Sequence, residues 1–204
     1  MTRGPSRWAL LAAIFAVMVA GDQVTKFLAV DRLTFAFQRL GASTLDAKVK
    51  AFYGTSHLES VARPPHVVWD PMWRMTYAEN PGAAWGMLRD LPAGFRHGFF
   101  VVMTLGALGF ILWYFRRLRE DQRYMQVALA FIFSGAVGNL IDRLARSYVI
   151  DFVQWHWWHR PDIYWPIFNL ADSLIVVGVA MILLAPNEQR AGSGKSGAAP
   201  EVQA

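Results

Sequence analysis

The chain has 204 residues, 54% of them hydrophobic, which exceeds the share of about 45–50% that is usual in soluble domains. It has no Cys, which excludes a disulfide framework and a thiol nucleophile. Its 20 Lys and Arg residues are scattered or lie beside apolar runs, so they indicate orientation in a membrane rather than binding of nucleic acid.

The first apolar run covers residues 8–21 and follows Arg3 and Arg7. One interpretation is a secretory signal peptide that ends in small residues at 19–21. The other is a transmembrane helix over about residues 8–30. We favour the helix, because three more apolar runs follow and because Asp22 and Lys26, four residues apart, can pair on one helical face.

Residues 31–96 contain no long apolar run and form a long first outer loop. Residues 46–53 are expected to form a short helix, and residues 72–77, rich in strand formers, a strand. The Asn-Pro-Gly sequence at 80–82 indicates a turn, after which residues 83–88 form a returning strand or a loop.

Three further spans are expected over about residues 97–115, 124–142 and 165–186, each long enough to cross a bilayer. Four Arg residues at 116, 117, 119 and 123 lie between the second and third spans, so this loop and both termini are expected in the cytoplasm. Residues 31–96 and 142–163, the latter a polar and aromatic loop, then share the outer side. Residues 187–204 are expected to be a disordered cytoplasmic tail.

Polar and charged residues gather at the outer ends of the last two spans. They are Asn139, Asp142, Arg143, Asp151, Asn169 and Asp172, and the topology brings Asp22 and Lys26 to the same face. Ionisable groups at this depth are costly, so each marks a candidate functional site. Two converging carboxylates can divide the work of peptide hydrolysis, since one keeps a proton while the other deprotonates water. Spacing alone leaves Asp142 and Asp151 both open as the partner of Asp172.

Simpler structural roles compete with these chemical ones. Asp142 and Arg143 can form an ion pair at a helix end, Asp22 and Lys26 a structural pair, and Asn169 a helix cap. His156 and His159 have a metal-ligand spacing, but the tryptophans between them indicate an interfacial loop, and no metal site is expected. The surrounding aromatic residues are typical of a belt at the lipid headgroups; they are Trp155, Trp157, Trp158, Tyr164 and Trp165.

Five motifs follow one another in the chain: Asp22-Gln-Val-Thr-Lys26, Asn80-Pro-Gly82-Ala-Ala-Trp-Gly86, Gly138-Asn139-Leu-Ile-Asp142-Arg143, Val149-Ile-Asp151-Phe152 and Phe168-Asn169-Leu-Ala-Asp172. Their order, their spacing and the four-span layout resemble those of bacterial lipoprotein signal peptidases (signal peptidase II) over about residues 8–186. Two features depart from the family pattern. The gap before Asn80 is longer than usual, which indicates an insertion within 41–67, and Ser147 stands where the family commonly has Gly.

The resemblance implies one integral-membrane domain over residues 1–186, mainly α-helical, with a small outer-face β-structure that cradles the substrate. It implies an aspartyl endopeptidase of the bacterial inner membrane that removes signal peptides from diacylglyceryl-modified prolipoproteins, cleaving before the lipidated Cys. Asp151 and Asp172 match the catalytic pair. Substrate-binding and supporting positions match Asn80, Gly82, Asn139, Arg143, Asn169, Asp142, Asp22 and Lys26. The implied enzyme is a monomer in contact with membrane lipid, needs no cofactor, and is inhibited by globomycin-type cyclic peptides.

Two other classes of function are weighed against the peptidase. Intramembrane Asp and Lys also mark proton relays, so a small ion- or proton-coupled transporter is the alternative. The charges lie at one face rather than at the midplane, and no internal repeat is present, which disfavours a transporter. A non-catalytic membrane adaptor is the third possibility.

Overall fold

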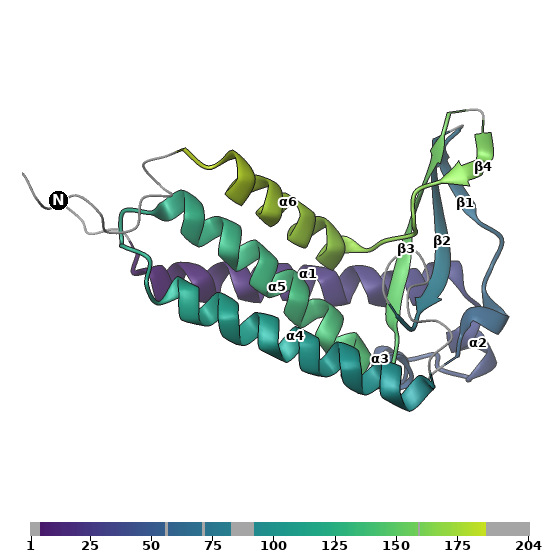
Figure 1. The fold of residues 1–204 in the computed structure, drawn as a ribbon. Helices are drawn as coiled ribbons and strands as arrows, with labels where there is room; N and C mark the ends of the chain where they lie inside the picture. The colour runs from purple at the N-terminus through teal and green to yellow at the C-terminus, as the bar shows by residue number, and fades with distance from the viewer. Residues whose placement is uncertain (1–4, 56, 71, 83–91, 159, 187–204) are drawn as a thin grey trace, which may run out of the picture.

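The structure is a computed structural model that describes residues 5–55, 57–70, 72–82, 92–158 and 160–186. Four apolar helices lie side by side, and a small sheet with two short helices stands at one end of them (Figure 1). The helices are α1 (Arg7–Leu33), α2 (Ala36–Arg39), α3 (Leu45–Gly54), α4 (Ala93–Phe115), α5 (Arg123–Arg146) and α6 (Leu170–Leu184), with a 3-10 turn η1 (Glu59–Val61). The strands are β1 (His66–Trp69), β2 (Trp73–Asn80), β3 (Val149–Trp157) and β4 (Arg160–Tyr164).

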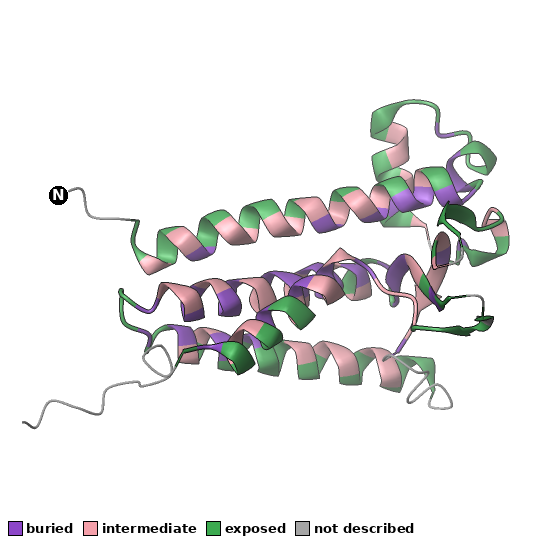
Figure 2. Ribbon diagram, turned by 90° about the horizontal axis from the view of Figure 1, so that it is seen from above, coloured by how far each residue is buried: buried purple, intermediate pink, exposed green. Residues whose placement is uncertain are grey.

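Three helices, α1, α4 and α5, are long and apolar enough to cross a membrane. In the most apolar 18-residue stretch of α5, 56% of the residues are buried, against 11% in α1 and in α4. Helix α5 is therefore the central helix of the bundle. Exposed positions recur along the long helices (Figure 2). On α1 and α4 they include apolar side chains, among them Val17 at 66% and Phe110 at 64%. Faces that carry such side chains are stable against lipid and not against water.

Helix α6 begins at Leu170, five residues later than the span predicted from 165. The preceding segment is extended, because the backbone of Phe168 exchanges hydrogen bonds with Val153 of β3 at 2.8 and 3.1 Å. Asn169 then caps the helix, which fixes its first residue. With 15 residues α6 is about 22 Å long, shorter than the hydrocarbon core of about 30 Å.

The sheet is antiparallel throughout, with strand order β1-β2-β3-β4. The central pair sets the position of one acid, because Ala78 of β2 lies opposite Asp151 of β3. The prediction of a strand over 72–77 is confirmed by β2, and that of a helix over 46–53 by α3. The polar and aromatic loop expected after the third span contains the β3–β4 hairpin, because aromatic and β-branched residues favour strand pairing there. The strand or loop expected at 83–88 lies outside the described residues.

One hydrophobic core joins the sheet to the adjacent end of the helix bundle. It contains the last turns of α1, the short helices α2 and α3, and the inward faces of β2 and β3, with Phe52 and Ile150 among its most buried side chains. A second core lies at the opposite end of α1, α4 and α5. The first core therefore packs directly beneath the strand that carries Asp151.

Candidate active site

The first turn of α6 holds two of the predicted site residues in a capping box. The side-chain oxygen of Asn169 accepts a hydrogen bond from the backbone N–H of Asp172 at 2.9 Å, and the carboxylate of Asp172 accepts one from the backbone N–H of Asn169 at 3.2 Å. The prediction that Asn169 caps a helix is confirmed. Because both side chains are tied to this turn, the Asp172 carboxylate has a fixed direction.

Asn139 of α5 connects the two sides of the site. Its amide nitrogen donates to Asp172 Oδ1 at 2.7 Å, while its oxygen accepts from Lys26 Nζ at 3.0 Å and from the amide of Asn169 at 3.1 Å. Asn139 is 6% exposed, and all its side-chain polar atoms are used. Its orientation is therefore set by three neighbours and in turn sets that of Asp172.

Asp151 meets the same cluster from β3. It accepts hydrogen bonds from the amide of Asn169 at 2.7 Å and from the amide of Asn80 at 3.0 Å. The residue is only 2% exposed. Burial, and next the negative charge of Asp172, raise the pKa of Asp151 to about 8, although both amides and Lys26 oppose this shift. The pair is therefore able to hold a proton at neutral pH.

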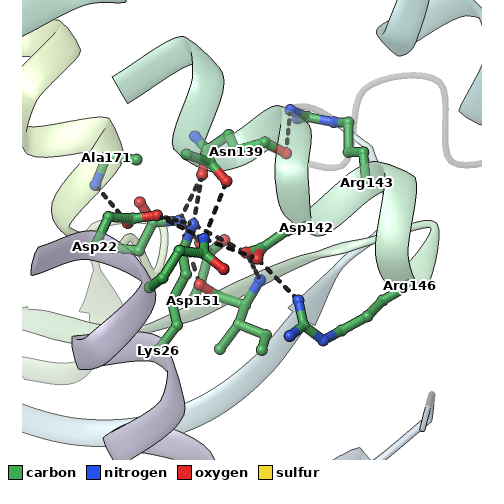
Figure 3. Close-up of polar contacts among 12 residues, drawn as sticks. Asp22, Lys26, Asn139, Asp142, Arg143, Arg146, Asp151 and Ala171 are labelled. Atoms are coloured by element: carbon green, nitrogen blue, oxygen red, sulfur yellow. Dashed lines mark hydrogen bonds and ion pairs between the residues drawn. The ribbon is translucent and has the colours of Figure 1, made fainter. Parts of the chain in front are cut away.

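A buried ionic cluster lies next to these residues and contacts them through Asn139 (Figure 3). Lys26 of α1 contacts Asp22 Oδ2 and Asp142 Oδ2, both at 2.9 Å, so with Asn139 its three protons all have acceptors. The side chains of Lys26, Asp22 and Asp142 are fully buried. The prediction that Asp22 pairs with Lys26 is confirmed. A second bond of Asp22, from the backbone N–H of Ala171 at 3.1 Å, ties α1 to α6.

The predicted ion pair between Asp142 and Arg143 is wrong. Asp142 Oδ1 pairs instead with Arg146 Nη1 at 2.9 Å, and its Oδ2 also accepts from the backbone N–H of Ile150 at 3.2 Å. Consecutive residues of a helix point to different faces, whereas residues four apart share one. Arg146 was not singled out from the sequence, although its spacing of four from Asp142 was a usable signal.

Arg143, which lies on a different face of α5 from Asp142, lines a cavity. Its guanidinium lies 3.5 Å from the carbonyl oxygens of Gly82 and Asn139, which are long contacts for a charged donor. The cavity has a volume of about 270 Å³ and is lined by Asn80, Gly82, Arg143, Trp165, Pro166, Ile167, Phe168, Asp172, Ile175 and Val176. Asp172 and Arg143 thus share an otherwise largely apolar space.

The structure brings all ten predicted site residues to one region at the end of the bundle that carries the sheet. They come from α1 (Asp22, Lys26), the end of β2 and the turn after it (Asn80, Gly82), α5 (Asn139, Asp142, Arg143), β3 (Asp151) and the start of α6 (Asn169, Asp172). Geometry also separates the two acids that spacing left open. Asp142 is held by two cations, whereas Asp151 accepts hydrogen bonds from the neutral amides of Asn80 and Asn169.

The two histidines with a metal-ligand spacing, His156 and His159, were considered above as a possible metal site. Among those residues, no group of three or more His, Asp or Glu side chains is placed to hold a metal ion. His156 is buried on β3, and His159 lies outside the described residues. The neighbouring Trp155, Trp157 and Trp165 are more than half exposed, as expected for an interfacial belt.

Comparison with known proteins matches this geometry to one family. The model of the signal peptidase (SPase) II family matches residues 14–186. A lipoprotein signal peptidase of an Anaeromyxobacter species is 59% identical over 191 residues, which cover 94% of this chain and 88% of the relative. One of Aeromonas hydrophila is 31% identical over 178 residues, covering 87% and 86%.

Solved structures agree with the sequence relatives. A bacterial membrane enzyme determined by the in meso method at 2.3 Å resolution has a TM-score of 0.62 and 26% identity, over 93% of this chain and 94% of that one. A second such enzyme, at 1.9 Å, has a TM-score of 0.59 and 28% identity, over 86% of this chain and 91% of that one. The chain therefore belongs to the signal peptidase II family.

Proposed function

We propose that this chain removes signal peptides from diacylglyceryl-modified prolipoproteins, cleaving before the lipidated Cys, and that Asp151 and Asp172 form the catalytic pair. As a signal peptidase II the chain is a membrane-bound protease of lipoprotein processing. The observation that carries the assignment of the pair is their convergence. Two carboxylates from β3 and α6 are both bonded to Asn169, and one of them lines the cavity.

The surroundings of the two acids support a division of labour. Asp151, 2% exposed and with a raised pKa, keeps the proton, because the ionised form is penalised most where water is excluded. Asp172 is half-buried and faces the cavity, where water has access, so it is the group that accepts a proton from the attacking water. As the water oxygen bonds to the scissile carbonyl carbon, the proton of Asp151 stabilises the developing oxyanion.

The other cavity residues suit the binding of a peptide. The hydrogen bonds of Arg143 to Gly82 and Asn139 are both long, so its guanidinium can donate to a substrate carbonyl at little cost. Asn80 is held by Asp151 and by the backbone N–H of Gly82 at 3.1 Å, which fixes the turn at the cavity edge. The apolar lining from Ile167 to Val176 fits an acyl chain or an apolar signal peptide.

The enzyme is a multi-pass membrane protein, and we assign it to the bacterial inner membrane with both termini in the cytoplasm. The four Arg residues at 116, 117, 119 and 123 support this orientation, because they lie between α4 and α5 at the end away from the site. Helix α6 is then the fourth span, and the β1–β4 sheet cradles the substrate at the outer face. The enzyme acts as a monomer in contact with membrane lipid, and globomycin-type inhibitors occupy the cavity beside Arg143. A proton-coupled transporter is not favoured, because the relatives are named peptidases.

Single amide substitutions test the catalytic pair. Asp151→Asn and Asp172→Asn are each expected to slow conversion of a lipidated prolipoprotein to its mature form by at least about 100-fold, because each removes one proton-transfer group. The conversion is followed on a gel with purified protein in lipid. Asp162→Asn is the matched control, since Asp162 is exposed and pairs with Arg160 of its own strand. The assignment fails if either site variant cleaves as fast as this control.

A further inference from the structure

Helix α3 contacts the ionic cluster chiefly through Phe52, and the neighbouring Tyr53 ring lies 5.3 Å from the Arg146 guanidinium carbon. Phe52 is 2% exposed and packs in the core beneath the sheet. Its backbone carbonyl accepts a hydrogen bond from Arg146 Nε at 2.9 Å, and its ring lies 4.0 Å from the Arg146 guanidinium carbon. A buried carbonyl and a ring face thus hold the same cation from two directions, which leaves the guanidinium little freedom.

Arg146 passes this constraint to the backbone beside Asp151. Its Nη1 holds Asp142 Oδ1 at 2.9 Å, and the other oxygen of Asp142 accepts from the N–H of Ile150 at 3.2 Å. Ile150 directly precedes Asp151 in β3, so a shift of the Asp142 carboxylate moves the catalytic strand. A second route runs from Asp142 through Lys26 and Asn139 to Asp172, with contacts of 2.9, 3.0 and 2.7 Å.

We propose that Phe52 and Arg146 are positioning residues for the reaction, through which α3 sets the geometry of the catalytic pair from outside the membrane bundle. This inference rests on the proposed roles of Asp151 and Asp172. Neither Phe52 nor Arg146 lines the cavity, so neither is expected to bind substrate. Their effect is therefore expected on turnover rather than on substrate affinity.

The charges of the cluster predict a second effect of removing Arg146, on the pH dependence of cleavage. Asp22, Lys26, Asp142 and Arg146 are buried and their formal charges cancel. Removal of Arg146 leaves one excess negative charge behind Asp151. The charged groups that act on Asp151 are then Asp172 from α6, Lys26 from α1 and Arg143 from α5, with Asp142 less neutralised than before. An added negative charge raises the pH at which the pair loses its proton.

The test uses the full-length enzyme in lipid with a synthetic diacylglyceryl lipopeptide, and measures kcat and KM over a range of pH. Arg146→Met is expected to lower kcat about 10–100-fold with KM nearly unchanged, as misplaced catalytic groups do. The alkaline limb of its pH profile is expected about one pH unit higher. Arg146→Lys keeps the charge but cannot bind both the Phe52 carbonyl and Asp142. Its kcat is therefore expected to fall, while the alkaline limb of its pH profile remains at the wild-type pH. Arg119→Met, which removes an exposed Arg, is the control.

Two double variants separate positioning from a general loss of structure. In Asp142→Asn/Arg146→Met the cluster is neutral again, so the alkaline limb returns to its wild-type pH. Phe52→Leu lowers kcat in the wild-type background. It has little further effect in the Arg146→Met background, because the Phe52 ring acts on the site through its contact with the Arg146 guanidinium.

The proposal is overturned if Arg146→Lys and Arg146→Met keep the kcat of the Arg119→Met control, or if the Phe52 and Arg146 effects are additive. Should Arg146→Met fail to fold, Arg146→Lys and Phe52→Leu alone decide. Failure of the proposed function has a different result, namely full cleavage by Asp151→Asn.

Discussion

The contact between Gly138 and Asp22 allows a sharp test of how the ionic cluster is packed. A Cβ atom added at Gly138 would lie 2.5 Å from Asp22 Oδ2 and 3.0 Å from its Cγ. Neither atom is the end of a flexible chain, because the carboxylate is held by Lys26 at 2.9 Å and by the N–H of Ala171 at 3.1 Å. Gly138→Ala must therefore displace a buried charge or separate α5 from α1.

The magnitude follows from two opposing effects. Overpacking of a dense core costs about 1–3 kcal/mol, whereas Gly to Ala inside a helix gains about 1 kcal/mol. Gly138→Ala is thus expected to lower the free energy of unfolding by up to about 2 kcal/mol. Gly109→Ala is the matched control, because Gly109 lies in α4 with no atom within 4 Å of the added Cβ. This variant keeps only the helix gain.

Both variants are compared by denaturant unfolding in one detergent and by cleavage of a lipidated prolipoprotein. Gly138→Ala should unfold at the lower denaturant concentration and cleave more slowly, because Asp22 anchors the turn that precedes Asp172. The reasoning is refuted if Gly138→Ala is as stable as Gly109→Ala and cleaves at the wild-type rate.

Three further predictions concern a strained turn, the buried lysine and pH. Ser147 caps α5 with a φ of 67°, so Ser147→Gly should raise the free energy of unfolding by about 1 kcal/mol in a denaturant titration. Lys26→Met leaves Asp22 and Asp142 with Arg146 as the one remaining cation of the cluster, and should lower the free energy of unfolding by about 3–5 kcal/mol in the same titration. The double variant Asp22→Asn/Lys26→Met should recover part of this loss. Because the pKa of Asp151 is raised to about 8, the pair holds its proton below that pH and loses it above, so cleavage should fall as pH rises through about 8; a rate that is flat from pH 7 to 9 contradicts this.

The sequence predicted those features that depend on local patterns. Apolar runs located α1, α4 and α5, and the spacing of four between Asp22 and Lys26 predicted their ion pair. The apolar run alone started the last span at about residue 165, too early for a helix, because the pairing of Phe168 with β3 keeps that segment extended. The capping role predicted for Asn169, in contrast, marks the true start of α6. The partner of Asp142 was also missed, since the choice between Arg143 and Arg146 depends on which face of α5 meets α1 and α3.

The choice between Asp142 and Asp151 could not be made from spacing either. The two residues differ in what surrounds them: Asp142 meets Lys26 and Arg146, whereas Asp151 meets amides and a second acid. Apart from Arg146, those neighbours come from helices and strands distant in the chain, and only packing brings them together. The positive φ of Ser147, by contrast, explains why Gly is favoured at that position.

The arrangement of the four buried charges has a consequence for how the protein enters the bilayer. Asp22 and Lys26 lie on α1, and Asp142 and Arg146 lie on α5, so each helix carries one acid and one base four residues apart. A single unpaired charge at the centre of a membrane helix costs about 2.5–3.5 kcal/mol on insertion scales, and pairing within the helix reduces that cost. Each helix can therefore enter the bilayer with these two charges already paired, and α5 carries only Arg143 besides them at this depth. The contact of Lys26 with Asp142 joins the two pairs and holds α5 beside α1.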